Sequence, residues 1–272
     1  MDFQVVSDLH LEFYKDKERG LPYIKVCASN LILAGDIGNP FKANYEIYLR
    51  WASRNYKRVF LISGNHEYYN RRKMEKVDDQ ISVVCSRFLN VTNLMEGPWI
   101  EGGVALVGET LWTNFEGQSD DFKRYLTKAM NDYGRISYKR PITPDQVTSL
   151  HLTQLESLKD SLRVLEKNDS VRKILVVTHH APSVEIVDPT MRDDGLRPAY
   201  ANSLESLLSE YPKLVLWVSG HTHYSGTTVV GTTRLLSNCR GYPQEKTNFK
   251  EDLVFRVQLE GSSEVPEGGI LV

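Results

Sequence analysis

Residues 59–67 read VFLISGNHE, an apolar run that ends in a short polar turn. A run rich in Val, Ile and Leu that stops at Gly and Asn is typical of a buried β-strand bounded by a turn. Asn65 and His66 are therefore predicted to lie directly beyond the carboxyl end of a strand. The same arrangement recurs along the chain, and this recurrence decides the predicted fold class.

Four further polar blocks follow apolar runs of the same kind. The blocks are SDLH at 7–10, GD at 35–36, THH at 178–180 and GHTH at 220–223, and the runs before them are 3–6, 31–34, 174–177 and 214–218. Six of the seven histidines lie in the polar blocks. In an open α/β sheet, ligands bind outside the carboxyl ends of the strands, so residues that are distant in the sequence can converge there.

The side chains of these blocks are of the types that bind metal ions. They are Asp8, His10, Asp36, Asn65, His179, His221 and His223. Imidazole together with carboxylate indicates a transition metal or Mn rather than Ca. A tetrahedral zinc site takes at most four protein ligands, so these side chains are too many for one ion. Two divalent ions that share one carboxylate fit the set better.

The blocks, in the order Asp-x-His, Gly-Asp, Gly-Asn-His-Glu, His and Gly-His-x-His, resemble the motifs of the calcineurin-like metallophosphoesterase superfamily. The resemblance runs from Asp8 to His223. It implies that Asp8, His10 and His223 bind one metal, that Asn65, His179 and His221 bind the other, and that Asp36 bridges them. Manganese is the metal that we expect, with Fe, Zn, Ni or Co as alternatives.

The resemblance also implies a reaction. A hydroxide bound to metal attacks a phosphodiester or phosphomonoester bond, and His66, which is not a ligand, protonates the leaving oxygen or stabilises charge in the transition state. Two metals can clamp the attacking and leaving oxygens of such a displacement. Two alternatives stay open from the sequence: a non-catalytic metal-binding scaffold, and a phosphoesterase that processes nucleic-acid ends.

Each block has an ordinary structural interpretation as well. Asp8 and Asp36 could cap helices, and Asn65 could be a turn residue. If these interpretations were all correct, five blocks would match the motifs of one family, in the order of that family, by chance. His151 lies outside the blocks, on the apolar stripe of a predicted helix, and we interpret it as a residue at the boundary of the core.

Substrate contacts are harder to predict from the sequence. The candidates are His180, Arg192, Arg197 and Trp112. Residues 110–140 mix aromatics with cations, including Lys123, Arg124, Arg135 and Lys139, and could stack a base and hold a phosphate, or form a half-buried surface helix.

The residues after Asp36 separate the chain from one branch of the superfamily. Protein Ser/Thr phosphatases typically carry a second Asp there, which orients the catalytic histidine. Here Asn39 could accept a hydrogen bond from His66, but a charged partner is absent from this position. The chain is more similar to compact phosphodiesterases and phosphatases, whose substrates include nucleotides and small phosphoesters.

Composition sets the frame for this site. The chain has 272 residues with a formal net charge of −2, and this charge gives no general attraction to nucleic acid or to anionic membranes. A small phosphoester or nucleotide is therefore the expected partner. No apolar run approaches the roughly 20 residues of a membrane span, and no secretory signal is recognisable. Three isolated cysteines favour a reducing, cytoplasmic compartment.

The periodicity predicts an α/β protein, with a single domain over residues 1–272. Helices are expected at 45–55, 73–88, 144–167 and 204–209, the third with Thr143 and Gln146 as a capping box. Strands are expected at 91–95 and 104–109, in a run of short strands within 227–237, at 253–259, and before each polar block. The order favours a four-layer α/β/β/α sandwich, in which two mixed sheets are flanked by helices.

Overall fold

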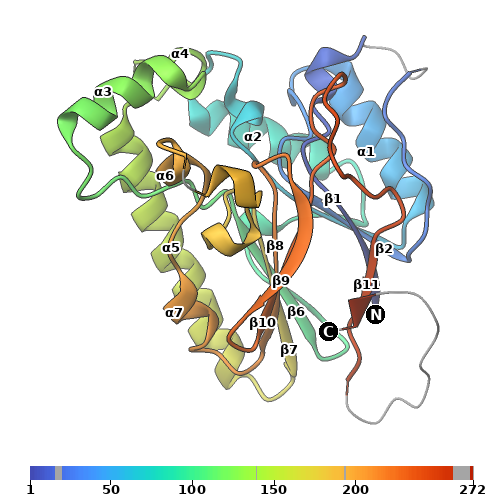
Figure 1. The fold of residues 1–272 in the computed structure, drawn as a ribbon. Coiled ribbons are helices and arrows are strands. Elements are labelled where there is room, and N and C mark those ends of the chain that lie inside the picture. Colours follow the sequence, from blue (N-terminus) through green and yellow to red (C-terminus); the bar gives the residue numbers. More distant parts are fainter. Residues whose placement is uncertain (16–19, 139, 193, 260–269, 272) are drawn as a thin grey trace.

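Two six-stranded sheets lie face to face in the computed structural model, which describes residues 1–15, 20–138, 140–192, 194–259 and 270–271 (Figure 1). The first sheet has the order β12-β11-β1-β2-β3-β4. Its strands are β1 Asp2–Val6, β2 Asn30–Ala34, β3 Arg58–Ile62, β4 Val91–Asn93, β11 Val254–Arg256 and β12 Ile270–Leu271. Strands β1 to β4 are parallel, whereas β11 runs antiparallel to β1.

The second sheet has the order β5-β6-β7-β8-β10-β9. Its strands are β5 Trp99–Glu101, β6 Val104–Glu109, β7 Lys173–Thr178, β8 Leu214–Ser219, β9 Ser225–Val230 and β10 Thr233–Asn238. Strands β6, β7, β8 and β10 are parallel, and the two edge strands are antiparallel to their neighbours. Both sheets are therefore mixed, as predicted.

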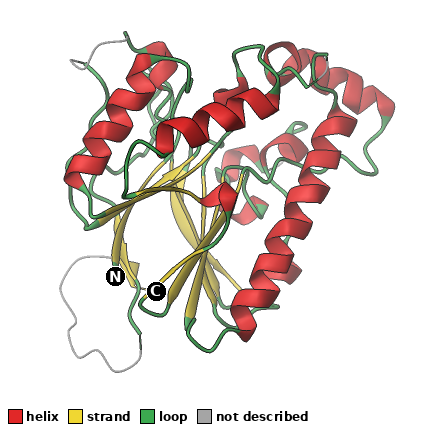
Figure 2. Cartoon of the chain, turned by 180° about the vertical axis from the view of Figure 1, so that it is seen from behind, coloured by secondary structure: helices red, strands yellow, loops and turns green. Residues whose placement is uncertain are grey.

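Helices cover the outer faces of both sheets (Figure 2). The longer ones are α1 Ala43–Asn55, α2 Met74–Cys85, α3 Asp120–Ala129 and α5 Pro144–Lys167, and the short ones are α4 Asp132–Arg135, α6 Arg197–Tyr200 and α7 Glu205–Leu208. Side chains alternate along each strand, so every strand contributes to two apolar layers. In β2, for example, Ile32 faces the other sheet, whereas Leu31 and Leu33 pack with the helices.

The four-layer sandwich expected from the sequence is confirmed. Strand β6 and helix α5 have the predicted bounds, and the Thr143–Gln146 capping box is present. Helix α2 ends at Cys85 rather than at 88, because Arg87 and Phe88 donate to carbonyls three residues back, which tightens the last turn. His151 is buried, and its Nδ1 lies 2.9 Å from the carbonyl oxygen of Leu111. None of the helices that the structure describes could span a lipid bilayer.

Candidate metal centre

The five polar blocks meet where the two sheets join at one end. Backbone hydrogen bonds link them directly: Asp8 N–H donates to Gly35 O at 3.1 Å, and Gly220 N–H donates to His179 O at 2.9 Å. An isolated parallel bridge between Ser7 and Cys239 connects the ends of β1 and β10, and so connects the sheets. The carboxyl ends of β1, β2, β3, β7 and β8 therefore surround one point.

The carboxylate of Asp36 lies between these strand ends and is buried. Its Oδ1 is 3.4 Å from Nε2 of His179. Its Oδ2 is 3.9 Å from Nε2 of His10 and 4.0 Å from Nε2 of His66. One carboxylate thus faces imidazoles on two sides, which is the position that a bridging ligand requires.

Asp8, His10 and His223 form a group on one side of Asp36. Nε2 of His10 is 3.0 Å from Nε2 of His223, which in turn is 3.5 Å from Oδ1 of Asp8. Their ligand atoms lie within 4.8 Å of one another, so one cation can reach all three. Two imidazole nitrogens and a carboxylate oxygen suit a transition metal.

Asn65, His179 and His221 lie on the other side. Nε2 of His179 is 3.0 Å from Oδ1 of Asn65, and the rings of His179 and His221 are 5.1 Å apart. Nε2 of His221 is buried and has no hydrogen-bond partner among the described residues. Burial lowers the pKa of His221 well below its usual value, so the ring is neutral. A buried, neutral imidazole nitrogen without a partner fits a metal ligand.

Most of these residues have an unusual backbone conformation. Asp8, His10, Asp36, His221 and His223 all have positive φ, between 49° and 69°. Non-glycine residues rarely adopt this left-handed region, and such strain is concentrated at functional sites. The strand-end turns therefore hold the ligands in place at a cost to local stability.

Two glycines of the blocks are required by close approach. A Cβ on Gly64 would meet the carboxylate of Asp36 and the ring of His179. Gly35 has φ of +86°, and a Cβ there would be 2.5 Å from Nδ1 of His179. No side chain fits at either position without displacing a candidate ligand.

Three carboxylates outside the polar blocks orient the candidate ligands. Glu12 Oε1 lies 3.1 Å from Nδ1 of His10, and Glu245 Oε2 lies 2.5 Å from Nδ1 of His223. Asp132 Oδ1 accepts a hydrogen bond of 2.9 Å from Nδ2 of Asn65, which turns the amide oxygen towards His179. Such partners fix the ring tautomer and the orientation of a ligand. Glu12 follows His10 by two residues, but nothing in the sequence marks Asp132 or Glu245.

Glu67 has a structural task in the same block. Its buried carboxylate accepts hydrogen bonds from the backbone N–H groups of Asp36, Ile37, Gly38 and Gly64. Burial and the neighbouring Asp36 raise the pKa of Glu67 to about 7, although the backbone N–H groups oppose this shift. Glu67 therefore joins the turn after β2 to the turn after β3 and fixes the backbone of Asp36.

His66 lies at the edge of the centre. Its Nδ1 is 2.8 Å from Oε1 of Glu12, its Nε2 is 3.3 Å from the hydroxyl of Tyr242, and its ring stacks on Tyr69 at 4.0 Å. Burial lowers its pKa, but the carboxylates of Asp36 and Glu12 outweigh this effect and raise the pKa of His66 to about 9.

His66 has a charged partner although no carboxylate directly follows Asp36 in the sequence. Asn39 accepts a hydrogen bond from the backbone N–H of Phe41 at 3.0 Å, whereas Glu12 supplies the carboxylate that faces His66. The 3-10 turn Leu11–Phe13, which follows the first polar block, brings Glu12 to this position. The partner carboxylate therefore comes from beyond the end of β1 and not from the residues after Asp36.

Two of the predicted substrate contacts lie beside the centre but are buried. His180 packs on His221 at 4.2 Å and on Trp112 at 5.5 Å. Burial and the neighbouring His179 lower the pKa of His180 to about 3, so it is neutral. The cavity next to this pair holds only about 10 Å³, too little for a substrate group.

Other predicted contacts are engaged elsewhere. Arg192 forms an ion pair with Glu185 at 3.1 Å, and Arg197 lines a separate cavity of about 310 Å³ with His151. In residues 110–140, Trp112 and Phe115 are buried, Lys123 is paired with Asp145 and Arg124 with Asp121. Lys139 lies outside the described residues.

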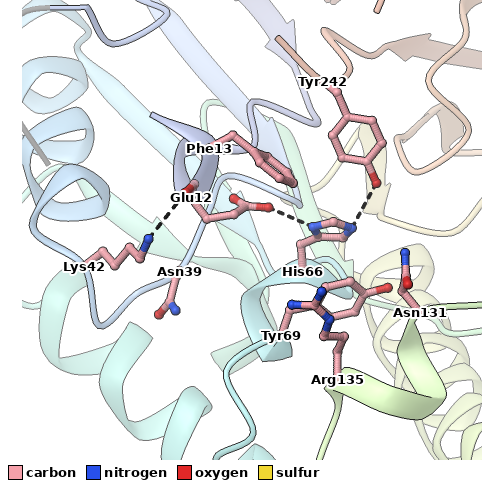
Figure 3. Close-up of a pocket in the computed structure, with 9 residues that line it drawn as sticks. All are labelled: Glu12, Phe13, Asn39, Lys42, His66, Tyr69, Asn131, Arg135 and Tyr242. Carbon is pink, nitrogen blue, oxygen red and sulfur yellow. Dashed lines mark hydrogen bonds and ion pairs between the residues drawn. The ribbon is translucent and has the colours of Figure 1, made fainter. Parts of the chain in front are cut away.

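A cavity of about 530 Å³ opens from His66 (Figure 3). Its walls carry aromatic, basic and amide side chains from several elements. They are Glu12, Phe13, Asn39, Lys42, His66, Tyr69, Asn131, Arg135 and Tyr242. Of residues 110–140, Asn131 and Arg135 line it. The Asp36 cluster and this cavity thus share His66.

Comparison with known proteins shows the family and the fold of the chain. The family model for calcineurin-like phosphoesterases matches residues 1–225. An uncharacterised protein of Acanthamoeba polyphaga mimivirus is 29% identical over 265 residues, which cover 90% of this chain and 92% of the relative. The crystal structure of phosphopantetheinyl hydrolase from Mycobacterium tuberculosis has a similar fold, with a TM-score of 0.65 and 19% identity over 89% of this chain and 90% of that chain.

Proposed function

The chain belongs to the calcineurin-like phosphoesterase family, and from this premise we propose that it hydrolyses small phosphoesters at a centre of two divalent metal ions. Asp8, His10 and His223 would hold one ion, Asn65, His179 and His221 the other, and Asp36 both. Support comes from the convergence of these side chains and from the unpartnered, buried Nε2 of His221. We expect manganese, with Fe, Zn, Ni or Co as alternatives.

Bound at this place, two metal ions would supply Lewis acidity and an activated water for in-line displacement at phosphorus. The protein contributes the orientation of the ligands and of the acid. The strained turns and Glu67 fix Asp36, while Glu12, Glu245 and Asp132 orient His10, His223 and Asn65.

His66 is the proposed acid, and its position is the observation that carries the proposal. Its Nδ1 faces Glu12, so its Nε2 points towards both Asp36 and the cavity. From there Nε2 can protonate the leaving oxygen or stabilise charge in the transition state. A positioned acid of this kind contributes typically about 10² to 10⁴ in rate.

The proposal extends to the setting of the reaction. Residues 1–272 would form one domain, since strands of both sheets contribute to one buried apolar layer, whose residues lie between Phe3 and Val257 in the sequence. A cytoplasmic protein with a small phosphoester or nucleotide as substrate fits the net charge of −2.

The test is metal-dependent turnover. Metal-stripped protein is resupplied with Mn, Fe, Co, Ni, Zn or Mg and assayed with bis(p-nitrophenyl) phosphate and p-nitrophenyl phosphate. We expect one or more metals to restore turnover, Asp36→Asn to abolish it, and the exposed variant Arg124→Ala to retain it. The ratio of the two substrates distinguishes diester from monoester hydrolysis.

Failure has three distinguishable forms. Protein that binds two ions but turns over neither substrate would contradict a general phosphoesterase. Protein that binds no metal would overturn the dinuclear centre and support a scaffold role. Turnover in Asp36→Asn equal to that of the wild type would remove Asp36 from the centre.

A further inference from the structure

The cavity beside His66 lies where the leaving group of the proposed reaction would be. In hydrolysis, water adds to phosphorus, the P–O bond to the leaving group breaks, and the Nε2 proton of His66 passes to the leaving oxygen. His66 lines the cavity, so the leaving oxygen and the group attached to it must extend into the cavity. The residues of its walls therefore select the leaving group.

Two cations reach this cavity from different elements. Lys42 precedes α1, and its Nζ donates to the backbone oxygen of Glu12 at 3.3 Å. Arg135 ends α4, and no carboxylate in the described parts of the chain forms an ion pair with it or with Lys42. By contrast, Lys123 and Arg124 of the neighbouring α3 are both paired with aspartates.

Glu12 is the one carboxylate among the described residues that line the cavity, and it forms no ion pair with these cations. Oε1 of Glu12 faces the Nδ1 atoms of His10 and His66. Two cations without carboxylate partners therefore remain available to a ligand, and such groups bind phosphate oxygens with charge-assisted hydrogen bonds.

Aromatic rings form another part of the wall. Phe13 is 58% exposed and Tyr242 38% exposed, and their rings meet edge to face at 5.3 Å. Exposed aromatic rings beside cations suit a planar ring that carries a phosphate, because a base can stack on the aromatic faces while cations hold the anion. A cavity of about 530 Å³ also falls within the size range of small-molecule sites.

We propose that the cavity binds a leaving group that is itself a nucleotide: its ring contacts Phe13 and Tyr242, and its phosphate contacts Lys42 and Arg135. This inference rests on the proposed function and specifies its substrate class. Two sources share this chemistry, a nucleoside bisphosphate and a dinucleotide with a terminal phosphate.

The experiment compares matched pairs that differ by one phosphate. Adenosine 3′,5′-bisphosphate is compared with adenosine 3′- and 5′-monophosphate, and the dinucleotide pApA with ApA, in the presence of the activating metal. In the wild-type protein we expect KM, or the inhibition constant where no turnover occurs, to be lower by about tenfold or more for the member with the extra phosphate. The pair that shows the difference identifies the source.

Variants assign the effect to the two cations. Lys42→Ala and Arg135→Ala should each remove most of the difference in KM, or in inhibition constant, within a pair. Each variant should also lose more affinity for the doubly phosphorylated compound than for p-nitrophenyl phosphate. Arg124→Ala removes an equal charge from an exposed position outside the cavity and should leave the difference intact. Lys42→Gln and Arg135→Gln replace any alanine variant that does not fold. The inference would be overturned if the wild-type protein had equal KM or inhibition constants within both pairs. It would also be overturned if the difference persisted in a variant that carries both Lys42→Ala and Arg135→Ala.

Binding separates this inference from the proposed function. Calorimetry with the same compounds needs no turnover. If no phosphoester is hydrolysed with any metal, the proposed function fails, whereas tighter binding of the bisphosphate that depends on Lys42 and Arg135 would still establish the anion subsite.

Discussion

The carboxylate of Glu12 faces Nδ1 of His66 at 2.8 Å and, through the same oxygen, Nδ1 of His10 at 3.1 Å. One side chain therefore orients both a candidate metal ligand and the candidate acid. Because both Nδ1 atoms donate to Glu12, both Nε2 atoms are left to face Asp36. The candidate metal ligand His10 and the candidate acid His66 thus share one orienting carboxylate.

Glu12→Gln should lower kcat by about 10- to 100-fold, because one amide oxygen is a weaker partner for two imidazoles than a carboxylate. KM should change little, and the loss should grow as the leaving group becomes a poorer one, since such substrates depend more on protonation. The measurement is kcat for a series of phenyl phosphates of different leaving-group pKa. A loss that is equal across the series would show that Glu12 does not act through His66.

His66→Asn should retain both metals and lose about 10² to 10⁴ in kcat. Metal content by mass spectrometry and turnover of p-nitrophenyl phosphate measure the two effects. Full metal occupancy with the parental rate would remove His66 from the mechanism. Loss of metal along with activity would instead make it a ligand.

Asp132→Ala should lower the affinity for one of the two metal ions by about 10- to 100-fold, because the Asn65 amide loses the acceptor that fixes its orientation. Isothermal titration calorimetry with the metal should show a lower affinity at one site and an unchanged affinity at the other. Asp121→Ala, on the surface of α3 and paired with Arg124, is the matched control. Affinities at both sites equal to those of the wild type would contradict the role of Asp132.

Gly64→Ala should abolish metal binding or folding, since its Cβ would overlap the carboxylate of Asp36 and the ring of His179. Gly134→Ala is the control, because a Cβ there meets nothing within 4 Å. Circular dichroism and metal content distinguish the two variants. A Gly64→Ala protein with normal metal content would show that the turn can relax.

The free energy of unfolding should depend on pH through the ionisation of Glu109. Burial raises the pKa of Glu109 from 4.5 to about 7, against a hydrogen bond from Ser157. The folded state therefore binds the proton more tightly than the unfolded state. The stability that this provides is fully present below about pH 4.5 and is lost as the pH rises through about 7.

Glu109→Gln should consequently stabilise the protein at pH 8 relative to the wild type, by up to about 3 kcal/mol, and have little effect at pH 4.5. Urea unfolding at the two pH values measures the difference. The same change in unfolding free energy at both would exclude titration of this carboxyl group.

Local sequence determined much of the fold. Strand β6 and helix α5 are as predicted, because apolar periodicity, Pro144 and the Thr143 cap act within one or two turns of chain. The strand-end blocks also predicted which side chains converge, since parallel strands place their carboxyl ends on one edge. The arrangement around Asp36 brings together the side chains that these blocks named.

Tertiary structure decided the surroundings of those side chains. The orienting contacts join residues that are distant in the sequence. Glu12 contacts His66 across 54 residues, Asp132 contacts Asn65 across 67 and Glu245 contacts His223 across 22, and no local pattern encodes such pairs. The cavity wall likewise joins Lys42 to Arg135 and Tyr242. The candidate ligands could be predicted from the sequence alone, because each of them follows the end of an apolar run that forms a strand. Which groups orient them, and which cations face the leaving group, was decided only when the packing of two sheets and their helices brought distant loops together.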